Sequence, residues 1–168
     1  MTRLDHQGSD ASANPTHRVG MRALVVGFGL VGRLVAERLT EQGCHVTIVE
    51  MNLRTIQAQL GLERHCTYGD ARDPETLHRA AIDRAHALIV TVPDEEAAVE
   101  IVRIAREMRP ELYIAARTNF VSRGLKARAM GANDVVIEEV VTAEAMERLV
   151  SRQWCDLDPG IGGRPATG

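Results

Sequence analysis

The glycine-rich segment Gly27-Phe28-Gly29-Leu30-Val31-Gly32 constrains the fold of this chain more than any other feature. It follows the apolar run 23–26 and begins a helical pattern of apolar residues at positions 31, 34, 35 and 39. A strand that turns through glycines into a helix directs backbone N–H groups and the positive end of the helix dipole toward one point, where a phosphate can bind. The segment therefore predicts a β-turn-α unit and a ligand that carries phosphate.

The context of this segment matters because a chain with 14 glycines among 168 residues can produce its spacing by chance. The next apolar run, 46–49, ends in Glu50, and this fold places a carboxylate about 20 residues after the glycines to accept hydrogen bonds from ribose hydroxyls. Residues 51–53 contain no arginine that could hold a 2′-phosphate, which favours NAD or an adenine nucleotide over NADP. The alternatives are an ordinary β-α turn and a strand-end glutamate in solvent.

Short apolar runs alternate with helical patterns along the chain, which is typical of a parallel sheet with helices on both faces. The third run is the most polar, so we expect it at the sheet edge. The sequence predicts a single α/β domain, a Rossmann-like doubly wound parallel six-stranded sheet of order 3-2-1-4-5-6. The expected strands are 23–26, 46–49, 65–68, 87–90, 112–116 and 135–137.

Local signals place several helix ends. Asp73-Pro74 predicts a helix start, Pro93-Asp94 a similar one, and Gly43, Gly61 and Gly131 predict helix ends. The helix after Asp94 has a wide apolar stripe, which fits either the sheet or a partner subunit. A last helical pattern at 143–150, with Thr142 as the expected cap, could cover the sheet or reach another copy.

The candidate binding residues all end or follow strands, so they share the rim where ligands bind in open α/β sheets. Asp70 could orient the adenine or ribose, or could belong to an ordinary turn. Arg117 could reach a phosphate, or could form a surface ion pair with Asp94 or Glu95. We expect no metal site and no catalytic residue. The predicted site comprises residues 27–32 with Glu50, Met51, Gly69, Asp70, Ala71, Thr91, Val92 and Arg117.

Composition excludes several classes of protein. The net charge of −3 and the five aromatic residues argue against a nucleic-acid partner. No apolar run approaches the roughly 18 residues of a membrane span, so we expect no membrane insertion and a cytoplasmic protein. The three widely spaced cysteines fit a reducing compartment. Residues 1–20 and 155–168 are expected to be a disordered leader and a disordered tail around a domain at 21–154.

With these residues placed, the chain resembles the TrkA-N, or RCK-N, nucleotide-binding regulatory domain of potassium transport proteins. Besides the glycine turn and Glu50, the resemblance rests on the segment 69–77, on Ala115-Ala116-Arg117 and on the segment 131–136. Residues 48–50 and 91–93 look closest to the cytoplasmic domains of Kef-like monovalent cation/proton antiporters.

The resemblance implies a non-catalytic domain that senses NAD(H) or an adenine nucleotide (AMP, ADP or ATP). It also implies a homodimer or higher ring that controls a membrane cation transporter or channel. Many members of the family have a basic residue where this chain has Leu30, so the phosphate-rich ligands are less favoured unless Arg33 substitutes. The alternatives are a small NAD-dependent oxidoreductase and an assembly module without nucleotide affinity. No Tyr-x-x-x-Lys pair supports the oxidoreductase.

Overall fold

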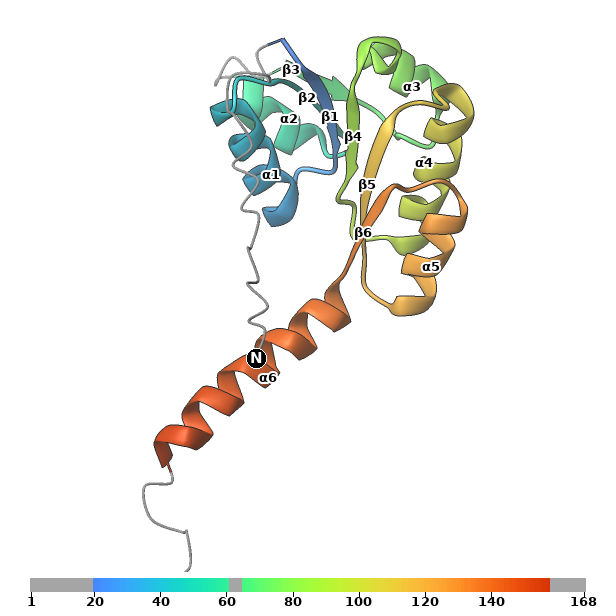
Figure 1. Cartoon of the computed structure of the whole chain (residues 1–168). Helices are drawn as coiled ribbons and strands as arrows, with labels where there is room; N and C mark the ends of the chain where they lie inside the picture. The colour runs from blue at the N-terminus through green and yellow to red at the C-terminus, as the bar shows by residue number, and fades with distance from the viewer. Residues whose placement is uncertain (1–19, 61–64, 158–168) are drawn as a thin grey trace, which may run out of the picture.

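The computed structural model describes residues 20–60 and 65–157, which form a parallel six-stranded sheet flanked by helices (Figure 1). The strand order is β3-β2-β1-β4-β5-β6, so the predicted fold and strand order are confirmed. The more polar β3 lies at the sheet edge, as expected. The strands are β1 (Arg22–Val26), β2 (His45–Glu50), β3 (His65–Tyr68), β4 (Ala87–Val90), β5 (Tyr113–Thr118) and β6 (Asp134–Ile137).

Helices cover both faces of the sheet because the strands that form its centre are apolar on both faces. In Figure 1, α1 (Leu30–Glu41) and α2 (Leu53–Leu60) lie on one side of the sheet. On the other side lie α3 (Pro74–Arg79), α4 (Glu95–Met108) and α5 (Val121–Ala129). The short 3-10 helix η2 (Ile82–Arg84) follows α3 and contacts it. Val25 and Leu88 on the central strands are fully buried, as expected of strands covered on both faces.

The helix ends follow the local signals closely. The carboxylate of Asp73 accepts a hydrogen bond from the N–H of Glu75, with Pro74 in the first turn, and the carboxylate of Asp94 accepts one from the N–H of Ala97. Gly43 and Gly131 follow helices with positive φ angles. Gly61 lies outside the described residues.

The apolar stripe of α4 packs inside the domain rather than against a partner. Its residues Ala98, Val102 and Ala105 are fully buried and belong to the hydrophobic core of the domain. Of the two readings of the stripe, packing against the sheet therefore accounts for these side chains.

The last helix, α6 (Glu138–Leu157), differs from the expectation in two ways. It begins directly after β6, so Thr142 lies inside the helix and does not cap it. It runs past residue 154, the expected end of the folded part. Of its two expected placements, the one over the sheet is not observed, because the helix leaves the body of the domain (Figure 1). In the described ranges, no helix is both long and apolar enough to cross a membrane.

Candidate functional site

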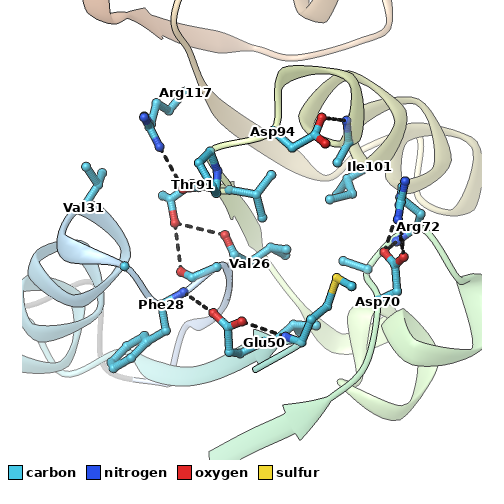
Figure 2. Close-up of a pocket in the computed structure, with 18 of the residues that line it drawn as sticks. Val26, Phe28, Val31, Glu50, Asp70, Arg72, Thr91, Asp94, Ile101 and Arg117 are labelled. Carbon is cyan, nitrogen blue, oxygen red and sulfur yellow. Dashed lines mark hydrogen bonds and ion pairs between the residues drawn. The ribbon is translucent and has the colours of Figure 1, made fainter. Parts of the chain in front are cut away.

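A pocket of about 490 Å³ opens at the carboxyl ends of the strands (Figure 2). It lies at the point between β1 and β4 where the strand order of the sheet reverses. The residues predicted from sequence converge on it: all of them line the pocket except Gly32. The strand order explains this convergence, because the carboxyl ends of parallel strands meet at one edge. The lining also includes residues that were not predicted as site residues, namely Val26, Val49, Arg72, Pro93, Asp94, Ala97 and Ile101.

The glycine turn is held against the end of β4 by close backbone packing. Gly27 has a φ of 86°, in the left-handed region that favours glycine. A Cβ on Gly32 would lie 2.0 Å from the carbonyl oxygen of Gly27, so Gly32 lies beneath the turn rather than in the pocket. The buried hydroxyl of Thr91 donates to the carbonyls of Val26 (3.0 Å) and Gly27 (2.9 Å), which ties β4 to the turn.

The N-terminus of α1 faces the pocket without a side-chain cap. Gly29 is the N-cap residue, and a Cβ built on it would meet nothing within 4 Å. The first turn contains no acidic residue. Backbone N–H groups at a helix N-terminus that lack intrahelical partners favour an anion.

Glu50 ends β2 and faces the glycine turn. Its Oε2 accepts a hydrogen bond from the N–H of Phe28 (2.8 Å), and its Oε1 accepts from those of Met51 and Asn52 (2.8 Å each). The carboxylate is therefore half-buried and oriented by backbone donors, unlike a strand-end glutamate left in solvent. Since a carboxylate offers about four acceptor positions and Glu50 lines the pocket, the carboxylate has acceptor capacity beyond its three backbone donors.

Asp70 and Arg72 form a fork-like ion pair across from the glycine turn (Figure 2). The Nη2 of Arg72 lies 2.7 Å from Oδ2 of Asp70, and Nε contacts both carboxylate oxygens. The hydrogen bond from the Arg72 side chain lowers the pKa of Asp70, although partial burial opposes the shift. Arg72 was missed from sequence as a site residue; its spacing of two from Asp70 within a turn is the signal that could have found it.

Arg117 lies inside β5, near its end, rather than after the strand as expected. Its ion-pair partner is Glu138, at an Nε to Oε1 distance of 2.5 Å, and not Asp94 or Glu95. Asp94 caps α4, while Glu95 accepts hydrogen bonds from the N–H groups of Asn119 and Phe120. The ion pair expected as an alternative for Arg117 therefore exists, but with a residue that belongs to α6.

Position 30, at the start of α1, supplies no charge to the pocket, because it is occupied by Leu30, which is 70% exposed. Arg33 is exposed but does not line the pocket, so it does not stand in for a basic residue at position 30. The cations in the lining are Arg72, paired with Asp70 inside the pocket, and Arg117. An anionic ligand would therefore meet α1's N–H groups and the guanidinium of Arg117.

Comparison with known proteins places this pocket in context. The family model described as the TrkA-N domain matches residues 23–138. A putative cation/proton antiporter, YbaL of Escherichia coli, is 30% identical over 128 residues, covering 76% of this chain and 23% of that protein. Probable potassium channel protein 2 of Methanocaldococcus jannaschii is 29% identical, covering 67% of this chain and 34% of that protein. The chain thus spans about a quarter to a third of these relatives.

Solved structures share the fold. The TrkA-N domain of the E. coli inner membrane protein YbaL superimposes with a TM-score of 0.75 at 30% identity, covering 79% of this chain and 98% of that one. The C-terminal domain of Kef from Shewanella denitrificans, solved in an AMP-bound form, gives 0.65 at 25% identity, covering 81% and 89%. The GsuK channel bound to NAD gives 0.71 at 25% identity, covering 79% and 24%.

Proposed function

We propose, because this chain belongs to the TrkA-N domain family, that its pocket binds NAD(H) or an adenine nucleotide such as AMP. In this proposal the domain is non-catalytic and regulates the transport of potassium, or another monovalent cation, across a membrane. It would act from the cytoplasmic side, on a transporter or channel subunit. A ligand regulates such a domain only if it binds two of its arrangements with different affinities.

The observation that carries the proposal is the position of Glu50 opposite the uncapped start of α1. The carboxylate is oriented by the N–H of Phe28 within the glycine turn, and it shares one pocket with the uncapped helix end, which supports a ribose at Glu50 and a phosphate at α1. Ribose next to phosphate is the chemistry shared by AMP and the adenosine half of NAD. The distribution of polar groups therefore supports an adenine nucleotide over a ligand without ribose.

The relatives support the same ligand class. An AMP-bound Kef domain and GsuK structures bound to NAD and to ADP have this fold, each at 25% identity to the chain. Leu30 supplies no charge at the phosphate end, which favours AMP or NAD over the more phosphate-rich ADP and ATP. ADP and ATP remain part of the ligand panel below.

A homodimer, or a higher ring, is part of the proposal. The helix α6 leaves the domain, and several of its apolar side chains are exposed. Apolar groups that are exposed together on one element favour association with a partner. The exposed apolar residues of α6 are Val140, Val141, Met146, Leu149, Val150 and Trp154. We propose that the α6 helices of two copies bury these groups.

A thermal-shift panel with NAD, NADH, AMP, ADP and ATP tests the ligand proposal. A ligand at 100 times its Kd stabilises the fold by about 2.7 kcal/mol, which is readily measured. We expect AMP or NAD to raise the Tm. If none of the five nucleotides does so, the proposal is wrong, and an assembly module without nucleotide affinity becomes the better description.

The variant Glu50→Ala locates the ribose. We expect it to remove most of the nucleotide-dependent shift, because the ribose loses its acceptor and the Phe28 N–H loses its partner. Glu41→Ala, which removes an exposed carboxylate paired with Arg38 on α1, is the matched control and should keep the full shift. The Tm of each variant without nucleotide separates lost binding from lost stability. An unchanged response of Glu50→Ala would place the ribose elsewhere.

A further inference from the structure

Arg117 connects the pocket to the first residue of α6. Its side chain lines the pocket, while its Nε donates to Oε1 of Glu138 at 2.5 Å. Glu138 begins α6 and does not itself line the pocket. One guanidinium group therefore contacts both the candidate ligand site and the helix that leaves the domain.

The remaining donors of Arg117 are weakly engaged. Its Nη1 lies 3.4 Å from the carbonyl oxygen of Thr91, and its Nη2 lies 3.3 Å from Oδ1 of Asn119. Both distances are long for hydrogen bonds of a guanidinium, whose charge-assisted bonds are usually shorter than 3 Å. Figure 2 shows this side chain above Thr91, on the side of the pocket where α1 and Val31 lie. An anionic group bound at the start of α1 could therefore accept hydrogen bonds from Nη1 and Nη2 of Arg117.

The start of α6 has a second attachment that does not involve the pocket. The N–H of Glu139 donates to the carbonyl of Asn119 (3.1 Å), and Oε1 of Glu139 accepts from the N–H of Val121 (2.6 Å). Loss of the Glu138 contact would leave these bonds in place. The helix would then stay attached, while its direction relative to the sheet would be held by fewer contacts.

We infer that the anionic group of a bound nucleotide and the Glu138 carboxylate compete for Arg117, so that ligand binding loosens the start of α6. This inference rests on the proposed function and deepens it by naming the regulated element. Two anions that share one cation weaken each other, since each reduces the charge available to the other and they repel. By linkage, the factor by which Glu138 weakens ligand binding equals the factor by which ligand weakens the Glu138 contact.

Calorimetric titration of AMP and of NAD into the full chain tests the competition. We expect Glu138→Gln to bind nucleotide about fivefold more tightly than the wild type, because the competing charge is gone while the shape is kept. Arg117→Gln should bind more weakly. The double variant should bind no more tightly than Arg117→Gln, because without the cation there is nothing to compete for.

Glu139→Gln is the matched control, since it changes the neighbouring glutamate, whose side chain contacts α5 rather than Arg117. It should leave the Kd unchanged. If Glu138→Gln binds nucleotide as well as or less well than the wild type, Glu138 positions Arg117 or is irrelevant, and the inference is overturned. If the wild type binds neither nucleotide, the proposed function itself fails, and the inference with it.

The fluorescence of Trp154 tests whether ligand binding loosens α6. This residue is the chain's one tryptophan, it lies on α6, and it is 69% exposed. We expect AMP or NAD to change its fluorescence anisotropy in the wild type but not in Arg117→Gln at saturating ligand. Saturation of the wild type without a change in anisotropy would show that α6 does not respond.

Discussion

Gly29 and Gly32 of the glycine turn differ in the space that surrounds them. Gly32 packs beneath the turn, where any Cβ would meet the Gly27 carbonyl, whereas Gly29 faces open space at the N-terminus of α1. Gly29 also has a φ of −71°, which other residues adopt readily. The same residue type therefore serves packing at one position and leaves open space at the pocket at the other.

Alanine at these two positions should separate stability from binding. Gly32→Ala must displace backbone, and we expect it to cost about 2 kcal/mol or more in the free energy of unfolding. Gly29→Ala should cost less than about 1 kcal/mol but weaken nucleotide binding, because the new methyl group enters the phosphate position. Urea unfolding and calorimetric titration measure the two effects. A Gly29→Ala variant with wild-type affinity would place the phosphate away from α1.

Leu30 is the residue at which charge can be added most directly. Leu30→Arg should tighten ADP and ATP binding by about 10-fold or more, because a charge-assisted hydrogen bond is worth about 1.5–3 kcal/mol. Leu34→Arg is the control: it adds the same charge on α1 at an exposed position that does not line the pocket. Equal gains in both variants would show a general effect of net charge rather than a phosphate contact.

Among the elements, α6 differs most from its neighbours. Helices α1 to α5 lie along the sheet, but α6 projects from the end of β6 (Figure 1). Several apolar side chains of α6 are exposed. The pattern of apolar residues in its sequence is that of a helix with a face to bury. The local signal located the helix but not its direction, because direction depends on contacts of Glu138 with β5 and of Glu139 with the β5–α5 connection and α5.

Association through α6 should be sensitive to a charge on its apolar side. We expect Leu149→Glu to shift the protein toward monomer, because a buried carboxylate without a partner is costly at an interface. Ser151→Glu is the control: it adds the same charge at an exposed polar position on the other side of the same helix and should associate like the wild type. Sedimentation velocity measures both. If Leu149→Glu associates like the wild type, the copies do not meet through this part of α6.

The stability of the whole molecule should fall in acid. The pKa values of Asp70, Asp83, Glu100, Glu111 and Glu138 all lie below their ordinary values in the folded protein. A carboxyl group with a lowered pKa in the folded state stabilises the protein above its unfolded pKa, and this contribution is lost as the pH falls through the folded pKa. Because all five shifts have the same sign, acidification removes their contributions together.

Urea unfolding at pH values from about 5 down to about 3 tests this expectation. The free energy of unfolding of the wild type should decrease over this range. In Asp70→Asn the decrease should be smaller, because the carboxylate stabilised by the hydrogen bond from Arg72 is absent. The same decrease in variant and wild type would show that the Asp70–Arg72 pair does not contribute to acid sensitivity.

Fold, strand order and the rim of the pocket were predictable from sequence because each depends on local patterns. Apolar runs such as 23–26 and 87–90 mark buried strands, the glycine turn marks the start of α1, and parallel strands bring their ends to one edge. The position of Glu50 at the pocket was predictable for the same reason, because this residue ends the strand β2 next to the glycine turn. These features follow from neighbours in the chain and from the rules of parallel sheets.

Side-chain partners across the fold required the tertiary structure. The pairing of Arg117 with Glu138 and the direction of α6 each depend on where segments distant in sequence meet. An arginine can reach any of several carboxylates, and local sequence does not rank them, because their free-energy differences are small and depend on geometry. The glycine turn is a property of the chain's order of residues, whereas the link from its pocket to α6 exists only in the folded molecule.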